Sequence, residues 1–104
     1  MKEIEIKGSD TLTENEKEIA NKILNNFYPK IQRIVKAPLS LKLYVKEYEK
    51  DGKGKKYSTN LEIRFSGKKM TSSSFDYDLS KAIRDSLTKI ENEIEHKFHS
   101  SEQH

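Results

Sequence analysis

Basic and aromatic side chains recur in this chain at spacings that place them on one side of a β-strand. Residues 39–46 alternate between apolar side chains and polar or aromatic ones, and residues 57–66 have a similar alternation. The side chains that would face away from a core are Lys42, Tyr44, Lys46, Tyr48, Asn60 and Arg64. Cations there can neutralise phosphates, and tyrosine rings offer flat surfaces on which unpaired bases stack. The pattern therefore predicts an RNA-binding sheet face.

Two other interpretations of this face stay open. An exposed antiparallel face is ordinarily polar, and cross-strand pairs of Tyr and Lys stabilise a sheet without binding anything. The same side chains could instead form a protein interface, with a homodimer as one case.

A second set of cations follows the first predicted helix. Lys30, Arg33 and Lys36 recur at intervals of three residues, and Lys22 precedes them on the same helix. A row of cations on the outer side of a helix can follow a phosphate backbone, and each contact adds to the salt dependence of binding. A solvated helix face is the alternative, and the basic segment 50–56 has the same two interpretations.

The charges are unevenly distributed along the sequence. The chain carries a net charge of +3, with −3 in residues 1–16, +9 in residues 17–69 and −3 in residues 70–104. A basic middle between acidic ends suits an anionic partner that meets one surface.

Catalytic and metal-binding chemistry has little support in the sequence. The absence of cysteine excludes thiolate chemistry, and neither a Gly-x-Ser-x-Gly motif nor a glycine-rich phosphate loop occurs. His96 and His99 are three residues apart on a predicted helix, but no third metal ligand lies nearby in the sequence. We therefore expect no enzyme activity, no metal, no cofactor and no small-molecule substrate.

The first part of the chain predicts a strand followed by a helix. Residues 2–7 alternate between charged residues and isoleucine, which is typical of a strand. Thr13 precedes Glu16 by three residues, the spacing of a capping box, and apolar residues then recur at helical spacing. Pro29 interrupts this helix. Because proline removes a backbone donor and clashes with the preceding turn, we expect a kink or break near residues 27–28.

The second part predicts a hairpin, a short strand and a closing helix. Two long alternating strands lie on either side of the glycine-containing segment 50–56. Gly67 stands first in an expected two-residue turn, which would pair Phe65 with Met70. Asp78 is the expected N-cap of the last helix, which carries one uninterrupted apolar stripe.

These elements predict an α+β domain with the order β-α-β-β-β-α. Each helix has one apolar stripe and each long strand has one apolar side, so both helices would pack on one face of a four-stranded mixed sheet. The first strand would lie parallel to a long strand, and the hairpin strands would be antiparallel. Residues 1–99 would form this single domain, and residues 100–104 a frayed polar tail.

Two local motifs add to this pattern. The last helix contains Asp78, Leu79, Ala82, Ile83, Leu87, Lys89 and Ile90. They are similar to the capped Asp-Met-Tyr-Ala-Ala-Ile opening and the Asp-Lys-Leu continuation of one protein family. The second motif is the opening of the first helix, where Thr13, Lys17, Glu18 and Ile19 are similar to the same family. Over residues 2–98 the chain resembles that family, the bacterial ribosome hibernation-promoting factors and the related ribosome-associated inhibitor called protein Y.

The resemblance implies binding to the small ribosomal subunit, in the channel where tRNA and mRNA would lie, and hence a block on translation while the cell rests. It also implies that basic side chains on the two helices touch rRNA. Lys17 and Lys89 match basic positions of the family, and Lys22 lies one position from another. The chain departs from the family at residues 91–95, where three glutamates stand in a region that is typically basic. Carboxylates repel a phosphate backbone.

Neither a charged-then-apolar leader nor an apolar run near the roughly 18 residues of a membrane span occurs in the sequence. We therefore expect a soluble cytoplasmic protein without a membrane partner. The leading hypothesis is a non-catalytic protein that binds the small ribosomal subunit or structured RNA and restrains translation. The alternative is a protein–protein interaction module, such as a homodimer, that uses the open sheet face.

Overall fold

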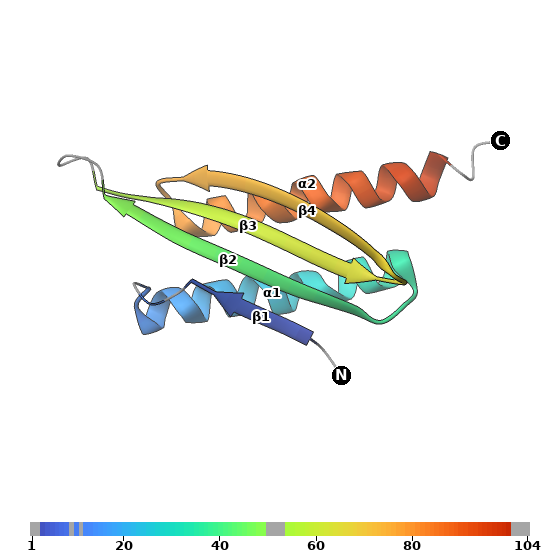
Figure 1. The fold of residues 1–104 in the computed structure, drawn as a ribbon, viewed down its shortest axis with the longest axis horizontal. Coiled ribbons are helices and arrows are strands. Elements are labelled where there is room, and N and C mark those ends of the chain that lie inside the picture. The colour runs from blue at the N-terminus through green and yellow to red at the C-terminus, as the bar shows by residue number, and fades with distance from the viewer. Residues whose placement is uncertain (1–2, 9, 11, 50–53, 101–104) are drawn as a thin grey trace.

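The computed structural model describes residues 3–8, 10, 12–49 and 54–100, with side chains as far as residue 97. The elements follow in the predicted order (Figure 1): strand β1 (Glu3–Lys7), helix α1 (Glu14–Val35), strand β2 (Leu39–Glu49), strand β3 (Lys55–Phe65), strand β4 (Lys68–Asp76) and helix α2 (Leu79–Ser100). Of the expected basic loop 50–56, residues 50–53 lie outside the described residues, whereas Lys55 and Lys56 belong to β3 and not to a loop. Of the expected tail, Ser100 is the last residue of α2, and residues 101–104 lie outside the described residues.

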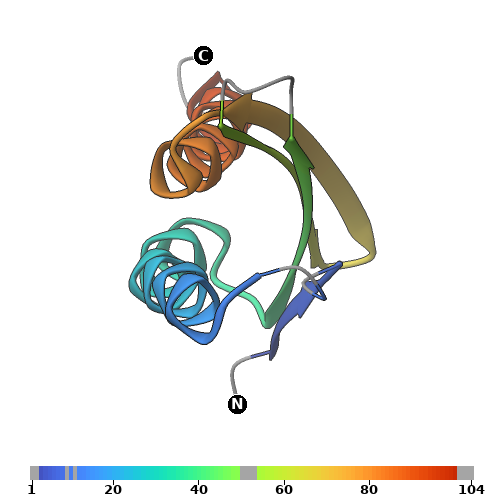
Figure 2. The same ribbon diagram turned by 90° about the vertical axis from the view of Figure 1, so that its left-hand side faces the viewer.

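The four strands form one sheet in the order β1-β2-β3-β4. β1 is parallel to β2, whereas the β2–β3 and β3–β4 pairs are antiparallel. Figure 2 shows both helices on the same side of the curved sheet, with the other side left uncovered. The predicted α+β class, the mixed sheet and the parallel first strand are thus confirmed.

The core lies between the sheet and the two helices. Leu43 on β2 and Ile63 on β3 are fully buried, and so are Leu24 and Ile31 on α1 and Ile90 on α2. Burying one such side chain stabilises the folded state by about 1.5–3 kcal/mol. Successive strand residues point to opposite sides of a sheet. The strand residues that lie between the buried ones therefore point to the uncovered side of the sheet.

Helix α1 begins with the predicted capping box. The backbone N–H of Glu16 donates to Thr13 Oγ1 at 3.1 Å, and the backbone N–H of Thr13 donates to Glu16 Oε1 at 2.9 Å. Two backbone donors at the start of the helix therefore have partners, which fixes where the helix begins.

Helix α1 runs unbroken through Pro29, so of the predicted kink or break near residues 27–28 the break does not occur. Leu24 before the proline and Ile31 after it belong to one continuous buried stripe. Pro29 itself is exposed. The packing of this stripe offsets the loss of one backbone hydrogen bond, which explains why the helix continues.

The turn between β3 and β4 lies one residue earlier than predicted. Its central residues are Ser66 and Gly67, with φ angles of 51° and 74°, and two positive φ angles are typical of a type I′ hairpin turn. The turn pairs Phe65 with Lys68, so the predicted pairing of Phe65 with Met70 is wrong. A register shift of two residues keeps each side chain on its face, and Met70 is still buried.

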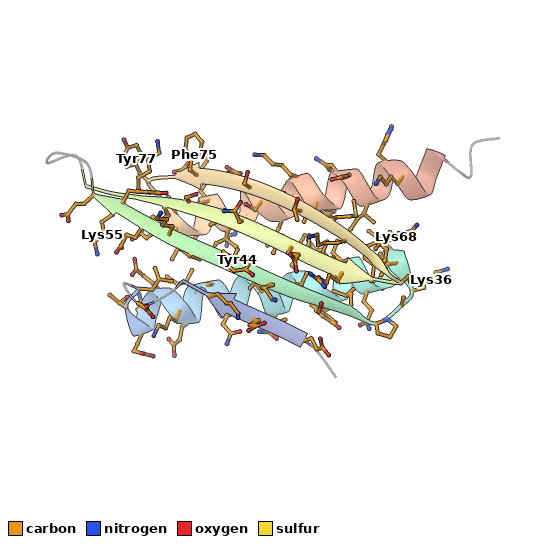
Figure 3. All side chains as sticks on the ribbon, in the orientation of Figure 1. Lys36, Tyr44, Lys55, Lys68, Phe75 and Tyr77 are labelled. Atoms are coloured by element: carbon orange, nitrogen blue, oxygen red, sulfur yellow. The ribbon has the colours of Figure 1, made fainter. Side chains whose placement is uncertain are left out.

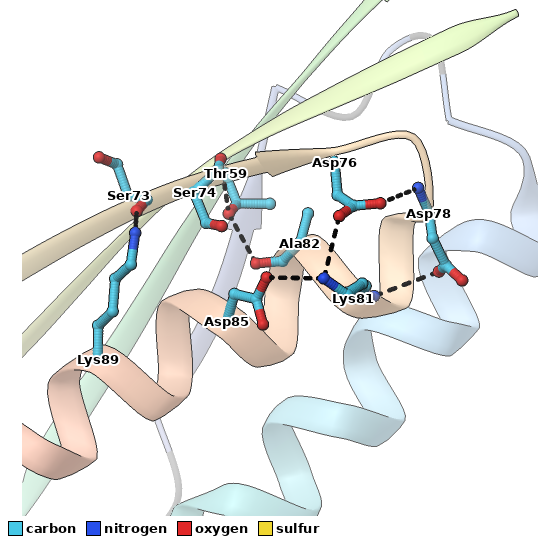
Figure 4. A network of polar contacts seen from close by, with 9 residues as sticks. All are labelled: Thr59, Ser73, Ser74, Asp76, Asp78, Lys81, Ala82, Asp85 and Lys89. Atoms are coloured by element: carbon cyan, nitrogen blue, oxygen red, sulfur yellow. Dashed lines mark hydrogen bonds and ion pairs between the residues drawn. The ribbon is translucent and has the colours of Figure 1, made fainter.

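Helix α2 starts at the predicted cap. The N–H of Lys81 donates to Asp78 Oδ1 at 3.2 Å, and the N–H of Asp78 donates to Asp76 Oδ1 at 2.9 Å (Figure 4). Small side chains let this helix approach β4 closely. The Ser72 hydroxyl on β4 donates to the Ser86 carbonyl oxygen of α2 at 2.6 Å.

Candidate nucleic-acid interface

The uncovered side of the sheet, here called the open face, carries more cations than carboxylates. The strand registers place Lys42 beside Glu5 and Glu62, and Arg64 beside Lys69, on this side. Its cations are Lys7, Lys42, Lys46, Lys56, Arg64 and Lys69, and its carboxylates are Glu3, Glu5 and Glu62. The face is therefore cationic overall. Figure 3 views it directly, with Tyr44 near the middle.

Acidic partners neutralise two of the predicted RNA-binding residues on this face. Lys42 Nζ lies 3.9 Å from Glu5 Oε1, and Arg64 Nε lies 2.9 Å from Glu62 Oε2. Glu5 also pairs with Lys7, at 3.3 Å. A phosphate would have to compete with these carboxylates, so the half of the face next to β1 is a weak anion site.

The other half of the face is aromatic. It lies at the end of β2 and the start of β3. Lys46 Nζ lies 5.3 Å from the centre of the Tyr48 ring, and Lys56 Nζ lies 4.3 Å from the centre of the Phe75 ring. Across the described residues, the exposed large hydrophobic side chains are Tyr44 (41% exposed), Tyr48 (43%), Phe75 (65%) and Tyr77 (54%). Figure 3 shows Phe75 and Tyr77 together at this end of the sheet.

Phe75, Tyr77 and Lys56 extend the set of residues predicted for this face. The alternation that turns Met70 inward turns Phe75 outward, five positions later. The sequence thus contained a signal for Phe75, whereas the position of Lys56 near both rings depends on the register of β3 with β4.

The cations predicted on the first helix lie together on its outer side. Lys22, Lys30 and Arg33 are exposed on α1 opposite its buried stripe, and the exposed Lys36 follows them as the C-cap residue. The sequence contains no Asp or Glu between residues 19 and 46. Within the part of the chain that the structure describes, none of the four forms an ion pair. Their charges can therefore act on an external anion. We call these four residues the α1 basic row.

A shallow groove of ≈ 330 Å³ separates the two helices and borders the α1 basic row. Lys30 lines it from α1, and Arg84 and Glu91 line it from α2. Arg84 is a further cation that the sequence pattern did not single out, because it lies on the flank of the α2 stripe. The groove brings positive charge from both helices to one surface, with Glu91 as the nearby opposing charge.

The two residues that best match the family's basic positions already have partners within the protein. Lys17 Nζ lies 3.6 Å from Glu14 Oε1, in the acidic first turns of α1. Lys89 Nζ donates to the carbonyl oxygen of Ser73 at 2.7 Å and so links α2 to the edge strand β4 (Figure 4). Both side chains are positioned by the fold, and RNA contact by either of them stays a prediction.

Resolved pKa shifts occur at structural contacts. The Tyr57 hydroxyl donates to Glu16 Oε2, and this bond, with the backbone N–H of Thr13, holds the pKa of Glu16 below its usual value. Burial, and then the same bond, raise the pKa of Tyr57. The pKa of Lys81 is raised by its contacts with Asp76 and Asp85 (Figure 4). The contacts that cause these shifts stabilise the ends of helices and strands. None of the shifted groups belongs to the α1 basic row.

In residues 3–8, 10, 12–49 and 54–100, no cluster of three or more His, Cys, Asp or Glu side chains is arranged to hold a metal ion. Neither described helix combines the length and apolar character that crossing a bilayer requires.

Comparison with solved structures places this fold among known ones. The N-terminal domain of protein Y from Thermus thermophilus is similar with a TM-score of 0.63 and 17% sequence identity, over 92% of this chain and 98% of that one. A ribosomal subunit interface protein from Coxiella burnetii gives a TM-score of 0.53 and 11% identity, over 91% of this chain and 93% of that one. No protein-family model and no curated protein sequence matches the chain. The resemblance noted from the sequence is thus confirmed for the fold: this chain folds like the protein Y N-terminal domain.

Proposed function

We propose that this protein binds RNA of the small ribosomal subunit and restrains translation, without catalysing a reaction. The observation that carries the proposal is the α1 basic row, four exposed cations in a segment, residues 19–46, that contains no carboxylate. The fold supports the choice of partner, because it is similar to a protein Y domain and to a ribosomal subunit interface protein.

The α1 basic row has the length to follow an RNA backbone. Lys22 and Arg33 are eleven positions apart on α1, which corresponds to about 16 Å along a helix, and Lys36 extends the row from the C-cap. Arg84 adds a cation from α2 across the groove from Lys30. Such cations displace counterions from phosphates, so binding weakens as salt rises. A protein held in this way in the channel for mRNA and tRNA would exclude both by occupying their space.

Sedimentation with purified small ribosomal subunits tests the proposal. The native protein is expected to co-migrate with the subunits at low salt and to dissociate as salt increases. The double variant Lys30→Glu/Arg33→Glu is expected to stay in the supernatant. Lys68→Glu/Lys69→Glu is the matched control, because it makes the same change in net charge at the β3–β4 turn. Failure of the native protein to co-migrate at low salt would remove the proposal, and equal loss in both variants would show that binding depends only on net charge.

A protein-interaction module remains the second candidate, because four large aromatic side chains of the described residues are exposed. A homodimer through the open face would bury Tyr44 and Tyr48 and would persist at high salt. Light scattering across a range of salt and protein concentrations separates the two functions, since the ribosome-binding proposal does not require a dimer.

A further inference from the structure

We propose that the aromatic half of the open face binds unpaired bases of RNA by stacking. The residues concerned are Lys46, Tyr48, Lys56, Phe75 and Tyr77, called here the aromatic–lysine cluster. The inference rests on the proposed function for the class of partner. It concerns a surface on the far side of the sheet from the helices, so it can fail independently of the α1 basic row.

The registers of three strands assemble the cluster. Tyr48 on β2 stands opposite Lys56 on β3, and Ser58 on β3 stands between Lys46 on β2 and Phe75 on β4. Because the serine side chain is short, it leaves a shallow hollow between its larger neighbours. Tyr48, Lys56 and Phe75 form the sides of this hollow, so aromatic rings and an ammonium group surround one small open space.

Within the aromatic–lysine cluster, Phe75 is the residue whose exposure the fold explains least. Its ring is 65% exposed although it has no polar atom, and its outward neighbours on β4 are the polar Thr71 and Ser73. The contact with Lys56 Nζ, 4.3 Å from the ring centre, is a cation–π interaction. Even with that contact most of the ring surface faces solvent, and exposed apolar surface of this kind is typical of a binding site.

The lysines favour nucleic acid over protein as the occupant. Lys56 Nζ lies 5.8 Å from the centre of the Tyr77 ring as well as near Phe75, and lysine is depleted in protein–protein interfaces. Alternating rings and cations are what single-stranded nucleic acid needs, since bases stack on the rings while the ammonium groups neutralise phosphates. Glu49 is the carboxylate that borders the hollow, whereas Asp76 is held by Lys81 at 3.4 Å.

The geometry selects unpaired bases over a duplex. Tyr48 and Phe75 lie on strands separated by β3, which places their backbones about 10 Å apart. Neighbouring unpaired bases can therefore lie on separate rings. In a duplex the bases are stacked inside the helix, and their faces cannot reach such a platform.

Fluorescence anisotropy with a labelled, unstructured ten-nucleotide RNA tests the inference, with the blunt duplex of the same strand as the comparison. The native protein is expected to bind the single strand more tightly than the duplex. Phe75→Leu keeps an apolar side chain but removes the ring, and it is expected to lower single-strand affinity by at least about fivefold. Phe75→Tyr keeps the ring and is expected to bind as the native protein does. Circular dichroism and thermal melting verify that each variant is folded.

Three results would overturn the inference. The first is equal single-strand affinity for the native protein and Phe75→Leu. The second is duplex binding as tight as single-strand binding. The third is a salt-insensitive dimer of the native protein that Phe75→Ala disperses, because that result would assign the cluster to a second protein copy.

The cluster and the proposed function can be separated by one further measurement. Phe75→Leu is expected to co-sediment with small subunits at low salt, because the α1 basic row is intact. If Phe75→Leu changes neither the affinity for the oligonucleotide nor the binding to subunits, the inference fails and the proposed function stands. If the native protein binds the oligonucleotide but not the subunits, the proposed function fails and the stacking surface stands.

Discussion

The hydroxyl oxygens of Thr59 on β3 and Ser86 on α2 lie 2.6 Å apart at a point that solvent does not reach. Thr59 Oγ1 also lies 3.2 Å from the carbonyl oxygen of Ala82 and 3.3 Å from that of Ser74 (Figure 4). Thr59 and Ser86 are the fully buried polar side chains in the described part of the chain. Their small size allows α2 to rest closely on the sheet, and this close packing fixes the position of the helix relative to the open face.

Ser86 is therefore expected to tolerate a smaller residue but not a larger one. Ser86→Ala should lower the free energy of unfolding by less than about 1 kcal/mol, because the Thr59 hydroxyl keeps the Ala82 carbonyl as an acceptor. Ser86→Leu should lower it by about 1–3 kcal/mol or more, because the added carbons have no space between helix and sheet. Urea unfolding measures both.

Thr88→Leu is the matched control, since Thr88 is exposed on the same helix and surface substitutions usually change stability by within about 0.5 kcal/mol. Equal effects at both positions would contradict the packing described for Ser86.

The bond between Tyr57 and Glu16 predicts a stability change in acid. The pKa of Glu16 is lowered in the folded protein by the Tyr57 hydroxyl and the Thr13 N–H. The carboxylate therefore stabilises the fold above its unfolded pKa of about 4.3, and this contribution is lost as pH falls through the lower folded pKa. Glu16→Gln, which can still complete a capping box, should be less stable than the native protein at pH 7.

Urea unfolding at pH 7 and at pH 3 measures this effect, and the difference between the native protein and Glu16→Gln should shrink in acid. Glu18→Gln serves as control, because Glu18 is exposed on the same helix. A difference between native protein and Glu16→Gln that is unchanged at pH 3 would show that the carboxylate charge contributes nothing.

Pro29 predicts a gain in stability on substitution. A proline in a helix interior is about 3 kcal/mol less favourable than alanine, and its restriction of the unfolded chain returns about 0.4–1 kcal/mol. Because Pro29 is exposed and lies within the unbroken helix α1, Pro29→Ala should raise the free energy of unfolding by about 2 kcal/mol. A thermal melt that shows a lower midpoint for Pro29→Ala would mean that the proline shapes the packing of the following residues.

The order of elements could be predicted from the sequence because several local signals agree. The capping box at Thr13 and Glu16, the cap at Asp78 and the alternating strands all hold in the structure. The β3–β4 turn could not be placed correctly, because Ser66 adopts a positive φ angle that its residue type does not suggest. Agreement of many weak signals fixes a fold, whereas one turn depends on a single residue.

The candidate site was only partly predictable, because charge pairing depends on which strands are neighbours. Lys42 meets Glu5 through the parallel pairing of β1 with β2, across more than thirty residues of sequence. Arg64 meets Glu62 on its own strand, two residues away, and this pair was visible in the sequence. The α1 basic row needed no tertiary information, because helical periodicity and the lack of nearby acids already define it.

The central claim, that the α1 basic row contacts RNA of the small ribosomal subunit, is tested most directly by the salt dependence of subunit binding. We predict that log Kd rises linearly with log salt for the native protein, and that Lys30→Ala/Arg33→Ala reduces the slope by about 2. Lys68→Ala, which removes an exposed cation at the β3–β4 turn, should change the slope by less than about 0.5. A slope for Lys30→Ala/Arg33→Ala equal to that of the native protein would contradict the claim.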